Sequence, residues 1–134
     1  MNKVRLQIIS PDKIEFDGEC TMLEYTTTEG CVGVMPGHVA MTQIIAPGKL
    51  AIYEEGKEKP TYAALISGIA TIMPDVITIL AETMERKEEI DVERAKASRE
   101  RALDRLEKRE PDTDLARAEQ SLKRANVRLE VAEM

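Results

Sequence analysis

The 134-residue sequence is poor in aromatic side chains and in histidine, with no tryptophan, one phenylalanine, three tyrosines and one histidine. Its two cysteines, Cys20 and Cys31, are too few for a disulfide framework, so we expect reduced thiols. It has no run of about 18 apolar residues, the length that a membrane-spanning helix needs. The segment 1–5 lacks the apolar stretch of a secretory signal. A net charge of −6 argues against nucleic-acid affinity, which needs a basic surface.

Glycine is also missing from the whole second part of the chain. The last glycine is Gly68, and only one of the six prolines, Pro111, follows Pro74. From residue 85 to 134, 27 of 50 residues are charged, 13 of them basic and 14 acidic. The first 84 residues carry 6 basic and 11 acidic side chains. This contrast predicts two domains, a β-rich domain over 1–84 and a helical domain over 85–134.

The first domain has the pattern of short strands separated by turns. Val4, Leu6 and Ile8 alternate with polar residues, which is the period of a half-buried strand. Two hairpins are expected, one joining 50–53 to 61–66 and one joining 69–73 to 76–80. Eight to ten such strands, with turn signals every 8–12 residues, predict an antiparallel β-sandwich.

The second domain has the spacing of two helices. The expected start of the first helix is capped by Asp91, and that of the second by Asp112, Thr113 or Asp114, after a turn at Pro111. Because the turn is short, the helices should form an antiparallel hairpin. Apolar residues recur at helical spacing at positions 92, 95, 102, 103 and 106 and at 115, 118, 122, 125, 129 and 132.

About half of the second series is alanine, which buries little apolar surface. Helices of about 16–20 residues are marginal in isolation. The hairpin is therefore expected to be held weakly enough to open or to repack, although a rigid hairpin remains the alternative.

No motif for catalysis is present. The glycine-rich run 30–38 lacks the lysine and the hydroxyl residue of a phosphate-binding loop. His38 is the only histidine, and the two cysteines lack zinc-ligand spacing, so neither a metal site nor a serine-histidine-aspartate triad is expected. We expect a protein that is not an enzyme, with no catalytic cofactor and no metal ligand.

One cluster of arginines stands out in the hairpin. With Leu106 placed opposite Leu115, the residues Arg94, Arg124 and Arg128 gather at the open end of the hairpin. Arg101 lies about 10 Å along the same face of the first helix. Either Glu93, Glu119 and Glu130 neutralise these guanidinium groups, or a polyanion such as a nucleotide phosphate does.

Three segments together resemble the epsilon subunit of bacterial F-type ATP synthase. The turn 30–38 is similar to the family's Gly-x-Leu-Gly-x-x-Pro-Gly-His, and 90–95 is similar to its Ile/Leu-Asp-x-x-Arg-Ala motif. The third segment is 122–129, in the second helix. The resemblance covers the whole chain in order and spacing. One departure is Ala40, where relatives commonly have proline.

The resemblance implies a non-catalytic stalk subunit at the cytoplasmic face of the bacterial cell membrane, without membrane insertion. Its β-sandwich would dock on the gamma subunit and, through Gly33, Pro36, Gly37 and His38, on the c-ring. Its hairpin would fold down or extend toward the beta and alpha subunits and then inhibit ATP hydrolysis. The stretch 94–109 has seven basic and three acidic residues, which suits an acidic partner.

The resemblance also implies that ATP binds the folded hairpin as a regulatory ligand. Family positions map the adenosine end of the ligand and its phosphates onto eight residues of this chain: Glu85, Ile90, Asp91 and Ala95 for the adenosine, and Arg94, Arg101, Arg124 and Arg128 for the phosphates. Two alternatives stay open from the sequence. They are a free-standing ATP-sensing module without a rotor partner and, less favoured, a nucleotide hydrolase.

Overall fold

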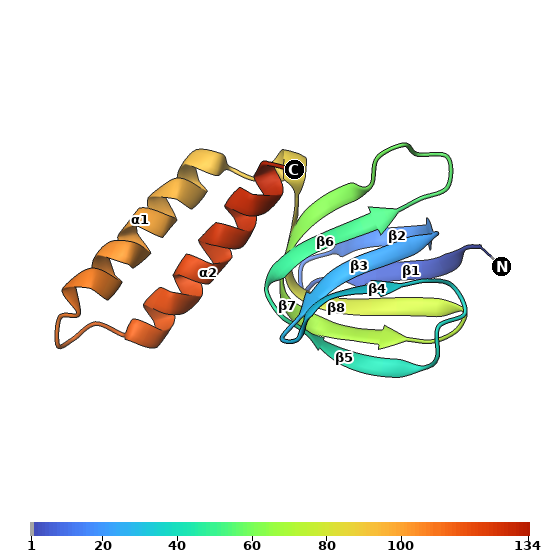
Figure 1. Ribbon diagram of the computed structural model, residues 1–134, viewed down its shortest axis with the longest axis horizontal. Coiled ribbons are helices and arrows are strands. Elements are labelled where there is room, and N and C mark those ends of the chain that lie inside the picture. The colour runs from blue at the N-terminus through green and yellow to red at the C-terminus, as the bar shows by residue number, and fades with distance from the viewer. Residues whose placement is uncertain (1) are drawn as a thin grey trace.

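The structure, a computed structural model that describes residues 2–134, has eight β-strands followed by two helices (Figure 1). A short 3-10 helix, η1 (Lys87–Glu89), connects the last strand to α1 (Val92–Lys108) and α2 (Leu115–Ala132). This confirms the expected β-sandwich and two-helix hairpin. The strands are β1 (Val4–Ile9), β2 (Ile14–Cys20), β3 (Met22–Thr27), β4 (Gly30–Val34), β5 (Met41–Ile45), β6 (Gly48–Tyr53), β7 (Thr61–Ile72) and β8 (Val76–Arg86).

The strands form a sheet in the order β2-β1-β8-β7-β6-β3-β4, with β5 paired to β7. The antiparallel pairs β6–β7 and β7–β8 confirm the two predicted hairpins. The expectation of a purely antiparallel sandwich is wrong in one place, because β1 and β8 pair in parallel. β8 ends at Arg86, two residues beyond the expected boundary after residue 84.

The paired strands β7 and β8 exchange their inner and outer faces at the same level, where their register steps from Ile66–Thr83 to Gly68–Ala81. In β7 the core-facing residues are 63 and 65 before the bend and 70 and 72 after it, so the strand exchanges its inner and outer faces. Ser67, at the bend, has the left-handed φ of 58°. The first half of β7 pairs with β6 and the second half with β5. The two segments predicted as separate strands, 61–66 and 69–73, therefore form one long bent strand.

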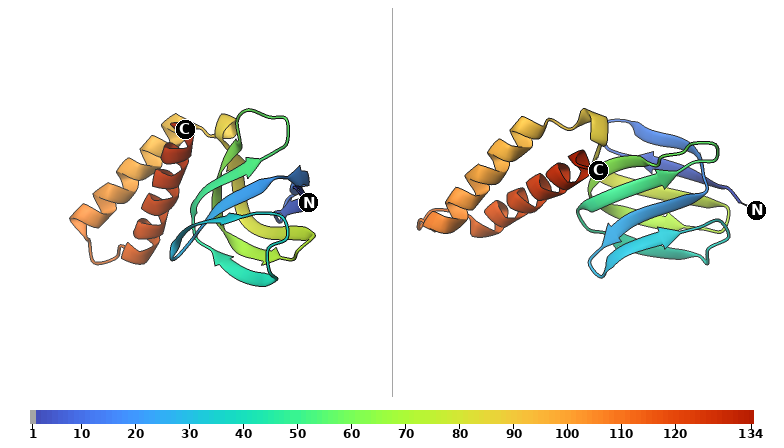
Figure 2. Two further views of the ribbon diagram at one scale, coloured as in Figure 1. Left: turned by 45° about the vertical axis from the view of Figure 1, so that its right-hand side comes forward. Right: turned by 45° about the horizontal axis from the view of Figure 1, so that its top comes forward.

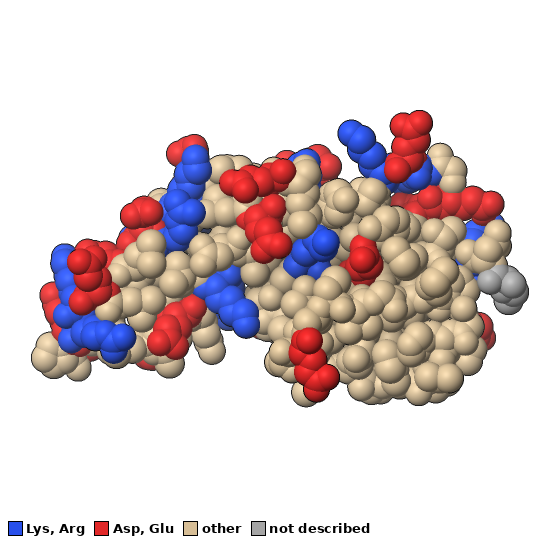
Figure 3. Space-filling model, in the orientation of Figure 1, with Lys and Arg blue, Asp and Glu red and all other residues tan. Residues whose placement is uncertain are grey.

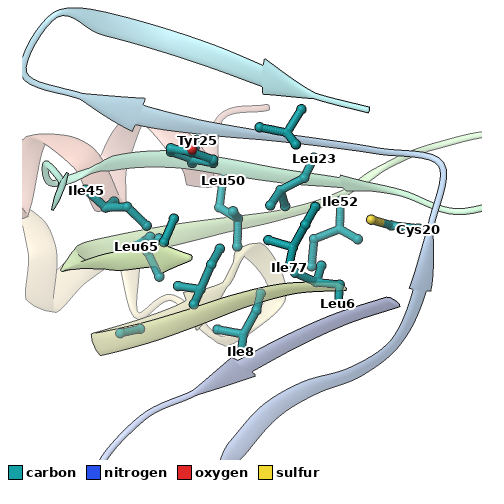
Figure 4. Close-up of a cluster of buried hydrophobic side chains, with 14 of the residues drawn as sticks. Leu6, Ile8, Cys20, Leu23, Tyr25, Ile45, Leu50, Ile52, Leu65 and Ile77 are labelled. Atoms are coloured by element: carbon teal, nitrogen blue, oxygen red, sulfur yellow. The ribbon is translucent and has the colours of Figure 1, made fainter. Parts of the chain in front are cut away.

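The sandwich core is aliphatic, as a chain with few aromatics requires. Figure 4 shows side chains from β1, β3, β6 and β7 pointing into one shared interior. Tyr25 is the largest side chain that is fully buried there. Burying a Leu or Ile side chain contributes about 1.5–3 kcal/mol, so this cluster supplies most of the stabilisation of the sandwich.

The outer face of the first half of β7 is also buried, by α2. Ala64 and Ile66 pack against Val127 and Val131 of α2 and against Ile90, which follows η1. Figure 2 shows α2 beside the sandwich and α1 farther out, with the hairpin turn projecting away. We refer to this second apolar cluster as the hairpin seat. It holds α2 against the sandwich, whereas the main contact of α1 is with α2.

The helix ends confirm the predicted caps. The Asp91 carboxylate accepts a hydrogen bond from the Arg94 amide at 3.1 Å, and Asp114 accepts one from the Arg117 amide at 3.0 Å. In α1, Ala95 and Ala102 are buried as expected, whereas Val92 and Leu103 of the same apolar series are 36 and 43% exposed. A contact built on small alanines leaves those two apolar side chains partly exposed at the sides of the helix.

The bend of β7 generates a prediction about Gly68. A Cβ at this position would lie 2.4 Å from the Leu80 carbonyl oxygen, which is part of the backbone and has little freedom to move. Gly68→Ala should therefore lower the free energy of unfolding by about 1–3 kcal/mol. Urea unfolding of the full chain measures this effect. Gly33→Ala is the matched control, because its Cβ meets nothing nearer than 4.0 Å; an equal loss in both variants would contradict the close approach.

Candidate functional site

A hollow of about 410 Å³ lies where the hairpin meets the end of β8. We call it the hinge hollow. It brings together five of the eight residues predicted to bind ATP, along with Thr83 and Ser98. The five predicted residues in its lining are Glu85, Asp91, Arg94, Ala95 and Arg128.

Each wall of the hinge hollow comes from a different element. Glu85 lies near the end of β8, on the strand face that also carries the hairpin seat. Asp91 and Arg94 are fixed by the cap that starts α1. Arg128 comes from α2, and its Nε donates a hydrogen bond to the Glu85 carboxylate, which also forms an ion pair with it. The hollow therefore exists only while the hairpin is folded against the sandwich.

The other three predicted residues lie nearby but outside the hollow. Ile90 is buried in the hairpin seat, beneath the start of α1. Arg101 donates a hydrogen bond from Nη2 to the Ser98 hydroxyl at 3.1 Å, so it lies one turn farther along α1. Arg124 turns toward the bend of the sandwich, where its Nη2 lies 3.7 Å from a Glu82 carboxylate oxygen.

Three residues at this site were not identified in the sequence: Thr83, Ser98 and Glu82. A signal for the first two was present, because Thr83 lies two residues before Glu85 on the same strand face and Ser98 lies one turn after Arg94. Glu82 could not be found in this way, because the bend in β8 determines where its side chain points.

Charge is concentrated over the hairpin. Figure 3 shows basic and acidic side chains crowded over the helices, whereas much of the visible sandwich surface carries neither. Arg128 and Arg124 are each neutralised by a glutamate of β8. Among residues 2–134, no carboxylate lies within the 4.0 Å ion-pair limit of Arg94. Its guanidinium remains available to an anion in the hinge hollow.

The turn predicted to face the rotor ring lies at the far end of the sandwich from the hairpin (Figure 1). Gly33 is the penultimate residue of β4. The amide of Gly37 donates to the Pro74 carbonyl at 3.2 Å, which ties this turn to the β7–β8 turn. Gly37 has a φ of 80°, a conformation that favours glycine. The same end of the molecule carries three exposed apolar side chains, Met35, Val39 and Met73, beside Pro36 and His38.

An apolar row crosses the outer face of the sheet over β5, β7 and β8. Ile44, Ile69 and Leu80 are directly paired across β5, β7 and β8, and they are 74, 46 and 55% exposed. The pairing continues through Ile9 to the exposed Ile14 on β2. A row of this size on one side of a small domain marks an interaction surface more often than an isolated exposed residue does.

The titratable groups offer little catalytic chemistry. Burial raises the pKa of the Cys20 thiol to about 11, which keeps it protonated at neutral pH, while Cys31 is free and exposed. Within residues 2–134, no group of three or more metal-ligating side chains is found. In the same range, no helix is both long and apolar enough to cross a bilayer.

Comparison with known proteins identifies this architecture. Residues 3–87 match the family "ATP synthase, Delta/Epsilon chain, beta-sandwich domain", and residues 88–133 match its "long alpha-helix domain". The ATP synthase epsilon chain of Bacillus licheniformis is 41% identical over 133 residues, which are 98% of this chain and 99% of that one. The epsilon chain of Bacillus velezensis is 39% identical over 132 residues, 98% of both chains.

A solved structure agrees with these relatives. A chain in the mitochondrial ATP synthase of Euglena gracilis, in an assembly of OSCP, F1 and c-ring, superposes with a TM-score of 0.85 at 26% identity. The match covers 100% of this chain and 83% of that one. Both domains and their order are thus shared with epsilon-type chains along the full length. The chain belongs to the ATP synthase delta/epsilon chain family.

Proposed function

We propose that this epsilon subunit, a non-catalytic part of the central stalk of F-type ATP synthase, is a brake on ATP hydrolysis that ATP holds in the released position. In this proposal ATP binds the hinge hollow of the folded hairpin. When ATP is scarce, the hairpin opens and extends toward the catalytic subunits. ATP is a regulatory ligand here and is not hydrolysed by this chain.

The observation that carries the proposal is that the hinge hollow is shared by three elements. Arg94 belongs to α1, Arg128 to α2 and Glu85 to β8. A ligand that contacts all three binds the folded arrangement and loses most of its contacts when the hairpin opens. Such a ligand shifts the population toward the folded state by its difference in affinity for the two states.

The magnitudes make this control feasible. A ligand at a hundredfold excess over its Kd stabilises the state that it binds by about 2.7 kcal/mol. The contact of α1 with α2 buries the small residues Ala95, Ala102, Ala118 and Ala125. The hairpin seat adds two valines, each worth about 1.5–3 kcal/mol when fully buried. Ligand binding is therefore comparable to the interactions that hold the hairpin down.

The sandwich supplies two docking surfaces in this proposal. The apolar row through Ile44, Ile69 and Leu80 suits the gamma subunit of the stalk, because it is exposed and lies outside the hairpin seat. The turn with Gly33, Pro36, Gly37 and His38 suits the c-ring, since it is at the end of the sandwich opposite the hairpin. In this proposal the subunit lies at the cytoplasmic face of the bacterial membrane in a proton- or sodium-translocating complex.

In this proposal α1 makes the inhibitory contact once the hairpin has opened. Between Arg94 and Arg109 the chain has seven basic and three acidic residues. This local excess of positive charge would attract an acidic segment of the beta subunit, with the alpha subunit beside it. Because the same stretch includes Arg94, ATP in the hinge hollow would also withhold one of the charges that the inhibitory contact uses.

The first prediction of this proposal concerns Arg128. Arg128→Ala removes the α2 wall of the hinge hollow, so the rise in Tm that ATP produces in the full chain should be abolished. Thermal unfolding with and without ATP measures this rise. Lys96→Ala is the matched control, because Lys96 is a cation of α1 that pairs with Glu93 outside the hollow. An unchanged ATP-dependent shift in Arg128→Ala would overturn the site.

The second prediction concerns docking on the stalk. Ile69→Lys places a charge in the middle of the apolar row and should reduce co-purification with the gamma subunit at least tenfold, a loss of about 1.4 kcal/mol. Its ATP-dependent Tm shift should be unchanged. Leu103→Lys, at an α1 position that is 43% exposed, is the control and should co-purify normally. Wild-type protein that binds ATP but never retains gamma would indicate a free-standing ATP sensor.

A further inference from the structure

The two helices of the hairpin carry the same sequence pattern. Residues 91–106 and 114–129 share eight identities when they are aligned with an offset of 23 positions. The shared pattern is Asp-x-x-Arg-Ala-x-x-Ser-x-x-Arg-Ala-x-x-Arg-Leu, and its first residue is the N-cap aspartate of each helix. Its matching pairs are Asp91 and Asp114, Arg94 and Arg117, Ala95 and Ala118, Ser98 and Ser121, Arg101 and Arg124, Ala102 and Ala125, Arg105 and Arg128, and Leu106 and Leu129.

The repeat explains why the alanine contact is regular. The four repeated alanines, Ala95, Ala102, Ala118 and Ala125, are all buried between the helices. In each helix the two arginines that precede these alanines, the serine between them and the arginine that precedes the repeated leucine follow one another at spacings of four, three and four residues. These spacings keep them along one flank of the helix. Each helix thus offers three arginines and one serine beside the alanine contact.

Because the helices are antiparallel, the repeat gives the hairpin two similar ends on that flank. At one end the hinge hollow is lined by Asp91, Arg94 and Arg128. At the hairpin turn a second hollow is lined by the matching residues Asp114 and Arg117, with Arg105 in place of Arg128. We call this the turn hollow. Its remaining lining residues are Glu110, Asp112 and Thr113.

The arginines of this flank are mostly free of ion pairs. Among the described residues, no carboxylate lies within the 4.0 Å ion-pair limit of Arg94, Arg101, Arg105 or Arg117. Asp114 in the turn hollow is engaged instead as the N-cap acceptor of the Arg117 amide. By contrast, three other cations of α1, Lys96, Arg99 and Lys108, each pair with a neighbouring carboxylate.

We propose that this flank, from the hinge hollow to the turn hollow, binds a linear chain of phosphates such as inorganic polyphosphate. The distance from Arg94 to Arg105 along α1 is about 16 Å, so the flank suits an extended polyanion. Forked guanidinium groups and serine hydroxyls are suitable donors to phosphate oxygens. Ser98 already accepts its hydrogen bond from Arg101, which leaves its own proton to donate.

Two features favour a phosphate chain over an acidic peptide. A peptide has two different ends, so its binding site has a direction. The repeat instead places matching groups at both ends of the hairpin, which suits a polymer of identical units. A peptide interface also needs an apolar centre. The exposed apolar residues of α1, Val92 and Leu103, fall on the opposite side of the helix from Arg94 and Arg105 by their spacing.

The test compares two probes on the full chain by titration calorimetry. Long-chain inorganic polyphosphate should bind at least tenfold more tightly, per chain, than inorganic tripolyphosphate. Arg105→Ala/Arg117→Ala should remove that tenfold advantage and leave ATP binding at the hinge hollow within twofold of the wild type. Both positions are exposed, and alanine is the best helix former, so the hairpin should persist.

The control is Lys96→Ala/Lys108→Ala, which removes the same number of charges from cations that are already paired. It should retain the polyphosphate advantage. An equal loss in this control, no advantage of the long chain in the wild type, or equally tight binding of polyglutamate would each overturn the proposal. Failure of ATP to bind would contradict the nucleotide proposal alone, since the comparison of the long chain with tripolyphosphate depends on the turn hollow.

Discussion

The structure depends on one strand segment that is buried on both faces. The first half of β7 contributes Ala63 and Leu65 to the sandwich core and Ala64 and Ile66 to the hairpin seat. A strand whose outer face is polar does not specify where a helix packs on it. A strand with apolar residues on both faces does, because the helix must cover the outer apolar residues. The position of α2, and with it the position of the hinge hollow, follows from this segment.

The bend at Ser67 is what makes this double burial possible. If β7 continued straight, its two faces would not exchange at the bend. The face that carries Ala64 and Ile66 would then continue along the whole strand, and the hairpin seat would extend with it. Because the faces exchange, Ile69 points outward beside β5, where it joins the apolar row. One irregular position thus separates the surface that receives the hairpin from the surface that remains free for a neighbouring subunit.

Much of this architecture can be predicted from the sequence, because local patterns cause it. The strand alternation, the aspartate caps and the break at Pro111 are short-range signals, and the structure confirms them. The bend could not be predicted, since a serine with positive φ has no distinctive sequence signal. The parallel pairing of β1 with β8 joins residues that are far apart in the chain, and no local pattern reports it.

The site shows the same division. Asp91, Arg94 and Ala95 lie together because helical spacing and a cap place them, which the sequence makes visible. The orientation of Arg124 depends on a second apolar face of α2, made by Val127 and Val131, which the alanine spacing does not reveal. With that face on the sandwich, Arg124 turns toward Glu82 rather than into the hinge hollow.

Two carboxylates of β8 pair with hairpin arginines, as an anionic ligand would. Glu82 and Glu85 pair with Arg124 and Arg128 while the hairpin is folded. These pairs are partly exposed, and ion pairs of this kind contribute only about 0–1 kcal/mol each. They are too weak to lock the hairpin, yet each balances the charge of one arginine and orients its side chain. In the proposed complex with ATP, a phosphate group would therefore replace a carboxylate at small cost.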